Sequence, residues 1–144
     1  MLRILVSCAL LLLLSVSCKK ENYNQQIGIP HYDVDQYVLL NNPTSITLNA
    51  VGGFLYQSGG SRGIVVYHRT YDEYVAFDRH CTWQPQETCG QVVIDSSTSV
   101  ILNCPCCDSR FSLIDGSVLH GPATFPLLQY NAQLSDPATL HIYN

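Results

Sequence analysis

Five cysteines lie within a stretch of 27 residues, and their spacing is the strongest chemical signal in the chain. They are Cys81, Cys89, Cys104, Cys106 and Cys107. Cys104 and Cys107 are three positions apart, a spacing at which a tight turn can direct two sulfur atoms at one point. A second loop that begins at Cys81 would complete a two-loop clamp, the way in which small β domains hold a metal centre. Thiolates grouped like this bind a metal or an iron–sulfur centre, or they form disulfides.

The two residues after Cys107 suit a turn that carries a ligand. Asp108 belongs to the few residue types besides glycine that tolerate a left-handed backbone. The Ser109 hydroxyl could lie near a bound sulfur or thiolate, where its hydrogen bond would stabilise added electron density and raise a redox potential. The same hydroxyl could instead cap the turn. We therefore include Ser109 among the candidate cofactor-binding residues, and both roles stay open.

Residues 1–17 are predicted to form a bacterial lipoprotein signal peptide. A short basic start with Arg3 is followed by an apolar run from Ile4 to Leu14, which is too short for a permanent membrane span. The end of this segment, Leu-Ser-Val-Ser-Cys, resembles a lipoprotein box in which Cys18 is acylated and becomes the new N-terminus. Ser15 replaces the usual apolar residue of that box. Ordinary signal cleavage nearby, which would leave Cys18 as a free thiol, is the alternative.

Residues 18–30 are predicted to be the lipidated cysteine and a polar tether, because they lack apolar periodicity and end in glycine and proline. Lipidation would attach the protein to a membrane of the bacterial cell envelope. Without residues 1–17, the chain keeps six basic and eleven acidic residues, a net charge of −5. Nucleic acid is therefore not an expected partner. Export also brings the cysteines into an oxidising compartment, and the odd number that remains cannot all pair.

Residues 31–144 are predicted to form one all-β domain, an antiparallel sandwich or barrel with two cysteine-bearing loops. Short apolar and β-branched runs alternate with turn residues, and no stretch has helical periodicity. The runs are Val34–Leu40, Ser45–Leu48, Ile64–His68, Tyr74–Phe77, Gln91–Ile94, Val100–Leu102, Phe111–Ile114 and Leu140–Tyr143. Asp115-Gly116 suits a tight two-residue turn, which would join Phe111–Ile114 to Ser117–Leu119 in a hairpin.

The stretch from about 76 to 130 resembles a Rieske iron–sulfur domain. Such domains carry a first loop Cys-x-His and a second loop Cys-Pro-x-His-Gly-Ser-x-Phe/Tyr, followed by an Asp-Gly turn and a Gly-Pro-Ala-x-x-Pro-Leu loop that shields the cluster. Cys81-Thr82 matches the first loop, and Cys104 to Phe111 matches the second. Asp115 to Val118 matches the turn, and Gly121 to Leu127 matches the shielding loop. The resemblance implies a Rieske-like β fold and a 2Fe-2S cluster.

Both histidine ligands of that family are replaced in this chain. Trp83 stands at the position of the first histidine and Cys107 at that of the second. An indole nitrogen is only a donor and cannot bind a metal. His80 is next to Cys81, but adjacent residues in an extended loop point in opposite directions. The remaining histidines, His31, His68, His120 and His141, are expected to be surface or packing residues.

Two assignments of the five cysteines compete. In the first, Cys89 and Cys106 form a disulfide, as the resemblance to respiratory-type members implies, and Cys81, Cys104 and Cys107 are three thiolate ligands without a named fourth. In the second, Cys81, Cys89, Cys104 and Cys107 form a four-thiolate set for zinc or an all-cysteine iron–sulfur centre, and Cys106 is free or buried. We slightly prefer the second, because it satisfies the ligand count.

The function that follows is a membrane-anchored electron-transfer module that passes electrons to an unidentified redox protein. Thiolates in place of imidazoles would lower its potential from the Rieske range of about −150 to +300 mV toward the roughly −400 mV of all-thiolate ferredoxins. The alternative is a structural or interaction domain that has lost its cluster and is held by zinc or disulfides. No enzymatic activity is expected, since the chain carries no hydrolase or P-loop motif.

Overall fold

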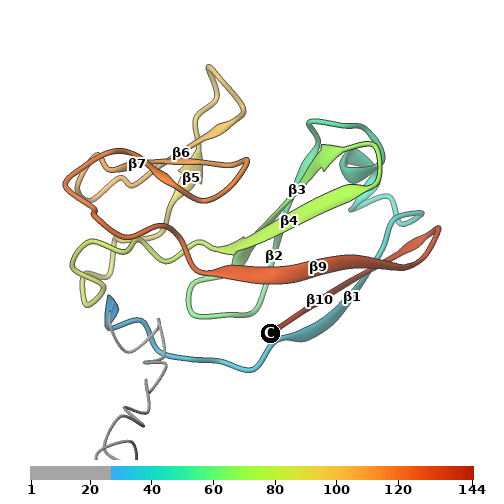
Figure 1. The fold of residues 1–144 in the computed structure, drawn as a ribbon, viewed down its shortest axis with the longest axis horizontal. Helices are drawn as coiled ribbons and strands as arrows, with labels where there is room; N and C mark the ends of the chain where they lie inside the picture. Colours follow the sequence, from blue (N-terminus) through green and yellow to red (C-terminus); the bar gives the residue numbers. More distant parts are fainter. Residues whose placement is uncertain (1–26) are drawn as a thin grey trace, which may run out of the picture.

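The computed structural model describes residues 27–144, which form two antiparallel β-sheets (Figure 1). The elements are β1 (Asp35–Leu39), a 3-10 helix η2 (Ile46–Asn49), β2 (Phe54–Gln57), β3 (Ile64–Thr70), β4 (Glu73–Asp78), β5 (Val93–Ile94), β6 (Ile101–Asn103), β7 (Arg110–Ser112), β8 (Val118–His120), β9 (Gln129–Asp136) and β10 (Thr139–Tyr143). The larger sheet has the order β1-β10-β9-β4-β3-β2, and the smaller sheet has the order β5-β6-β7-β8. This architecture confirms the predicted all-β, antiparallel fold class.

The hairpin of β3 and β4 lies at the centre of the molecule and is buried on both faces. Alternate side chains of a strand point to opposite faces, so each face of this hairpin carries its own core. Val65, Tyr67, Val75 and Phe77 pack toward the smaller sheet, together with Leu102, Phe111 and Leu113. Ile64, Val66, Tyr74 and Ala76 pack toward Val38, Leu48, Leu140 and Ile142. Burial on both faces explains why the sequences of β3 and β4 contain continuous apolar runs instead of alternating apolar and polar residues.

The structure differs from the sequence prediction in two segments. The run Ser45–Leu48, expected to be a strand, is part of a turn and of the 3-10 helix η2, because the Leu48 N–H donates to the Ser45 carbonyl at 2.9 Å. The Ser45 hydroxyl also donates to the Asn42 carbonyl at 3.1 Å. Strand β9 was not predicted, because its outward residues are polar and Tyr130 is its one fully buried side chain.

The connection between β7 and β8 is longer than the predicted two-residue turn. Five residues, 113–117, separate the two strands. Leu113 is fully buried in the core beside the smaller sheet, so the chain must turn inward before it can reverse direction. Gly116 has a φ of +74°, and its N–H donates to the Ser112 carbonyl at 2.8 Å. The Asp-Gly pair therefore closes a wider loop around a core residue.

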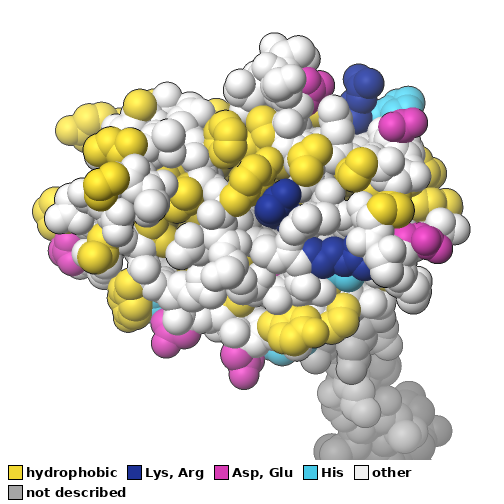
Figure 2. All heavy atoms as spheres, turned by 180° about the vertical axis from the view of Figure 1, so that it is seen from behind, with side chains coloured by type: hydrophobic (Ala, Val, Ile, Leu, Met, Phe, Trp, Pro, Cys, Tyr) yellow, Lys and Arg dark blue, Asp and Glu magenta, His cyan; other side chains and the backbone are white. Residues whose placement is uncertain are grey.

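The signal peptide and Cys18 lie outside the described residues. Ile27 and Ile29, in the C-terminal part of the predicted tether, are buried against the domain, so the packed chain begins before residue 31. Within the described part of the chain, no helix is long and apolar enough to cross a membrane. On the face shown in Figure 2, basic side chains stand apart from one another instead of forming a continuous stripe. The absence of nucleic acid as a partner stays a prediction.

Gly116 provides a direct test of this packing. An added Cβ would lie 2.7 Å from the Phe77 ring, in a left-handed backbone that alanine adopts poorly. We expect Gly116→Ala to lower the free energy of unfolding by about 2 to 4 kcal/mol, measured by urea denaturation. The matched control is Gly52→Ala, which has a φ of +87° but no heavy atom within 4 Å, and should cost only about 1 kcal/mol. Equal losses in the two variants would contradict the close contact with Phe77.

Candidate thiolate centre

Three cysteine sulfur atoms converge where the central hairpin meets the smaller sheet. Cys81 follows β4, Cys104 follows β6, and Cys107 precedes β7. Their Sγ atoms all lie within 4.8 Å of one another, and the Cys81 and Cys107 sulfurs are 3.7 Å apart. Cys81 and Cys104 are buried, and Cys107 is half-buried. The sulfur atoms from two loops thus meet at one point, as the spacing predicted.

Backbone hydrogen bonds hold both loops in place. The Cys81 N–H donates to the Gly90 carbonyl at 2.9 Å, which closes the base of the first loop. In the second loop, the Cys104 N–H donates to the Ser109 carbonyl and the Asp108 N–H donates to the Cys104 carbonyl, each at 2.9 Å. Asp108 has a φ of +58°, which confirms its predicted left-handed backbone. The tight turn brings Cys104 and Cys107 to the same side.

The Ser109 hydroxyl links the thiol group to the loop that follows β8. Its oxygen accepts a hydrogen bond from the Ala123 N–H at 2.9 Å and lies 3.1 Å from the Cys107 sulfur. The neutral Cys107 thiol donates to this oxygen, and once Cys107 is ionised the hydroxyl hydrogen can be donated to the thiolate instead. Ser109 is fully buried, so this hydrogen bond is shielded from water. The hydroxyl thus lies beside the Cys107 sulfur, as predicted, and the same group also holds the loop that follows β8.

Cys81 and Cys107 differ in how readily they lose a proton. Burial raises the pKa of Cys81, and its contacts with the Cys104 and Cys107 sulfurs add to the shift. Burial also opposes ionisation of Cys107, but hydrogen bonds from the Ser109 hydroxyl and amide, together with the other two thiols, outweigh it and lower the Cys107 pKa. Negative charge is therefore accommodated better at the half-buried Cys107 than at Cys81.

Cys89 and Cys106 form a disulfide with a Cα–Cα distance of 5.5 Å. The structure therefore departs from the four-thiolate set that we slightly preferred, because Cys89 bonds to Cys106 and Cys106 is not free. The slack in the loop between Cys81 and Cys89 allows this pairing, and it ties the first loop to the second. Cys81, Cys104 and Cys107 remain as the three thiols of the first assignment.

The position of the first missing histidine holds no metal donor. Trp83 is 38% exposed, and its neighbour Thr82 donates from its hydroxyl to the Phe125 carbonyl at 2.6 Å. His80 is buried, with Nδ1 at 2.8 Å from the Ser61 hydroxyl and Nε2 at 2.7 Å from the Pro85 carbonyl. Burial lowers the His80 pKa. Both ring nitrogens are thus already in use, which agrees with the expectation that His80 is not a ligand.

The other four histidines also lie apart from the thiols. His68 stacks on Tyr74 with ring centroids 4.2 Å apart, and His141 stacks between two tyrosines of the larger sheet. His120 is exposed on β8, and His31 lies 3.4 Å from the Asp33 carboxylate. None belongs to the group of convergent side chains formed within residues 27–144. Their predicted packing and surface roles agree with these positions.

Asp78 is a structural residue that the sequence did not reveal. Its carboxylate is fully buried at the end of β4 and accepts four hydrogen bonds. The donors are the backbone N–H groups of Ser61 (2.6 Å), Arg62 (3.2 Å) and His80 (2.9 Å) and the Tyr130 hydroxyl (2.8 Å). This network sets the direction in which the chain leaves β4 toward Cys81. A lone acid at the end of the apolar run Tyr-Val-Ala-Phe was the available signal.

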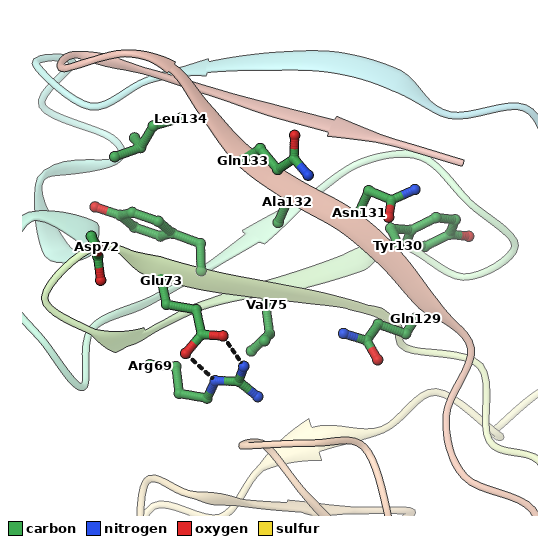
Figure 3. Close-up of a pocket in the computed structure, with 11 residues that line it drawn as sticks. Arg69, Asp72, Glu73, Val75, Gln129, Tyr130, Asn131, Ala132, Gln133 and Leu134 are labelled. Carbon is green, nitrogen blue, oxygen red and sulfur yellow. Dashed lines mark hydrogen bonds and ion pairs between the residues drawn. The ribbon is translucent and has the colours of Figure 1, made fainter.

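A separate groove lies between β4 and β9 (Figure 3). The two strands pair only at Ala76–Tyr130 and Phe77–Gln129 and then diverge, which opens a space of about 720 Å³. Arg69 and Glu73 form an ion pair at its edge, visible in Figure 3. None of the cysteines lines this groove, so it is distinct from the thiolate centre.

Comparison with known proteins supports the fold. No family model matches the chain, and no curated protein matches it. The chain is similar to the crystal structure of the cyanobacterial plasma membrane Rieske protein PetC3 from Synechocystis PCC 6803, with 23% identity and a TM-score of 0.55, over 79% of this chain and 100% of that one. It is also similar to a chain in the complex of reduced oxygenase and oxidized ferredoxin in carbazole 1,9a-dioxygenase, with 16% identity and a TM-score of 0.52, over 78% and 94%. The chain therefore has the fold of a Rieske-type domain.

The Asp78 network can be tested by stability. Asp78→Asn replaces one acceptor oxygen by an NH₂ group, so either the Ser61 N–H or the N–H groups of Arg62 and His80 lose their acceptor, and the remaining hydrogen bonds lose the carboxylate charge. We expect the free energy of unfolding to fall by about 2 to 4 kcal/mol, measured by urea denaturation. Tyr130→Phe, the control, removes one donor and should cost about 1 kcal/mol. If Asp78→Asn is no more damaging than Tyr130→Phe, the carboxylate does not organise the Cys81 loop.

Proposed function

We propose that this chain is an electron-transfer domain whose iron–sulfur centre is held by Cys81, Cys104 and Cys107. The observation that carries the proposal is the convergence of three sulfur atoms at the loop ends of a Rieske-type fold. Three soft thiolates fit an iron–sulfur centre, but they do not fit the usual cluster with two histidine ligands, because Trp83 and Cys107 occupy those positions. When bound, a 2Fe-2S cluster would supply one-electron transfer.

The residues around the thiols suit such a centre. Cys81 and Cys104 keep their sulfurs away from water, and Ala123 and Leu127 of the shielding loop are buried in the same core. The Ser109 hydroxyl lies 3.1 Å from the Cys107 sulfur, so it is placed to donate a hydrogen bond to that sulfur when Cys107 is a thiolate ligand. Since no imidazole belongs to the group, we expect a low potential that changes little with pH near neutrality.

The proposal includes attachment to a membrane. Lipidation of Cys18 would anchor the domain at the bacterial cell envelope, with the first residues of the mature chain as a short tether. An unidentified redox protein at the same membrane would be the electron-transfer partner. The signal-like sequence of residues 1–17 and the sequence around Cys18 support this part of the proposal.

A second candidate is a structural domain with zinc or without any metal. Two observations favour it. The Cys89–Cys106 disulfide already joins the two loops, and burial raises the Cys81 pKa, which favours a neutral thiol. Zinc–sulfur bonds of about 2.3 Å in a tetrahedral site imply sulfur atoms roughly 3.8 Å apart. The 3.7 Å between the Cys81 and Cys107 sulfurs matches a single ion.

Iron and sulfide analysis separates the two candidates. After anaerobic reconstitution with iron and sulfide, the wild type should be red-brown and contain both elements, and Cys107→Ser should lose most of them because one of three ligands is gone. His120→Gln is the control, and it should keep the wild-type iron content since this exposed histidine lies outside the thiol group. A folded, colourless wild type without iron would contradict the proposal, and one bound zinc would favour the structural domain.

The Ser109 hydrogen bond predicts a change in potential. Ser109→Ala removes a donor to the Cys107 sulfur, and a hydrogen bond to a charged group contributes about 1.5 to 3 kcal/mol. We expect the midpoint of the reconstituted protein to fall by up to roughly 100 mV, measured by redox titration. Ser117→Ala, in the same hairpin but bonded to Asp115, should leave it unchanged. A midpoint in Ser109→Ala equal to the wild type would show that the hydroxyl does not act on the centre.

A further inference from the structure

The Cys89–Cys106 disulfide lies next to the thiol group in both loops. Cys106 directly precedes Cys107, and both side chains pack against the core cluster that contains Cys81 and Cys104. In the first loop, Cys89 precedes Gly90, whose carbonyl accepts the Cys81 N–H at 2.9 Å. A Cβ at Gly90 would lie 3.6 Å from the Cys81 Cβ. Cys106 is therefore next to the proposed ligand Cys107, and Cys89 is next to Gly90, which is hydrogen-bonded to the proposed ligand Cys81.

The thiol group lacks one donor for a tetrahedral site. Metal sites built from thiolates usually have four ligands, and three are present here. Neither Trp83 nor His80 can supply the fourth ligand. The Trp83 indole nitrogen is only a hydrogen-bond donor, and both ring nitrogens of His80 are already hydrogen-bonded. Within residues 27–144, the only further cysteine sulfurs are the two in the disulfide.

We propose that reduction of the Cys89–Cys106 disulfide releases Cys89 as a fourth thiolate ligand, so that the protein switches between a three-thiolate and a four-thiolate metal site. This inference rests on the proposed thiolate centre. An external dithiol supplies two electrons and two protons and is itself oxidised to a disulfide. The bond between the two sulfurs breaks and two thiols form, and the Cys89 thiol loses its proton when it binds the metal.

The surroundings of the disulfide suit such a reaction. Cys89 is exposed and Cys106 is half-buried, and exposed disulfides are the ones that reductants reach. The base of the first loop stays closed when the disulfide opens, because the Cys81 N–H and the His80–Gln91 bridge hold it independently. Cys89 would therefore stay near Cys81 after release.

Cys89 is a better fourth ligand than Cys106. Cys106 is adjacent to Cys107 in a tight turn, and adjacent residues tend to point in different directions, so both cannot easily face one ion. The first half of this loop is fixed from outside, since Arg62 and His80 donate hydrogen bonds to the Pro85 carbonyl. Around Cys89 the backbone hydrogen bonds are local, from the Glu87 N–H to Gln84, from the Gly90 N–H to Glu87 and from the Gln91 N–H to Cys89. The short segment 86–89 can therefore adjust without disturbing the core.

Cobalt(II) is a suitable probe, because its absorption reports the number of thiolate ligands. We would titrate Co²⁺ anaerobically into four forms of the full chain: oxidised wild type, wild type reduced with a phosphine, Cys106→Ser, and the double variant C89S/C106S. Cys8 and Cys18 are the same in all four. The reduced wild type and Cys106→Ser should bind Co²⁺ more than about tenfold more tightly than the other two forms and show stronger sulfur-to-cobalt charge transfer.

Each of the other possible outcomes would overturn a defined part of the proposal. Equal affinity and equal spectra in the oxidised and reduced wild type would overturn the switch and leave the three-thiolate centre standing. Cys89→Ser, titrated in the same way, leaves Cys106 as the free thiol, and tight binding by this variant but not by Cys106→Ser would overturn the assignment to Cys89. Failure of every form to bind Co²⁺ would overturn the switch together with the proposed centre. The double variant titrated with phosphine present controls for binding of Co²⁺ by the reductant.

Discussion

The convergence of three sulfur atoms depends on two loops that are attached to the same core. The β3–β4 hairpin is buried on both faces, so the direction of β4 is determined by packing on each side. At its end, the buried Asp78 carboxylate accepts three backbone N–H groups and directs the chain to Cys81. The second loop joins β6 to β7, whose residues Leu102 and Phe111 are buried in the same core as Cys81. A shift of either loop would separate the sulfurs.

The Rieske-type fold is present without the histidines that usually accompany it. The exposed Trp83 and the thiol of Cys107 stand where that family has two imidazoles, so the thiol group has no imidazole that would titrate near neutral pH. The structure accommodates negative charge at Cys107, next to the Ser109 hydroxyl and amide. The disulfide that crosses between the loops keeps their relative position without help from a metal.

Sequence reasoning predicted those features that depend on local residue chemistry. The short apolar runs indicated an all-β fold, the Cys104–Cys107 spacing indicated convergent sulfurs, and Asp108 and Ser109 have the predicted backbone and position. The partner of Cys89 could not be derived, because the loop after Cys81 is long enough to reach either candidate. The turn between β7 and β8 was misjudged because Leu113 enters the core, a tertiary effect that the Asp-Gly signal does not contain. Asp78 was missed for a similar reason, since three of its four donors come from distant segments.

The most direct test of the central claim is whether three thiols can bind one atom at the same time. Trivalent arsenic forms three bonds to sulfur, so arsenite can report this geometry without iron or zinc. Mass spectrometry of the treated, disulfide-intact protein should find one arsenic atom bound with loss of three protons. Cleavage after Glu87 separates Cys81 from the disulfide-linked Cys89, and the Cys81 peptide should then stay joined to the peptide with Cys104 and Cys107 through arsenic alone. Arsenic bound only to the latter peptide, or none bound at all, would contradict the account.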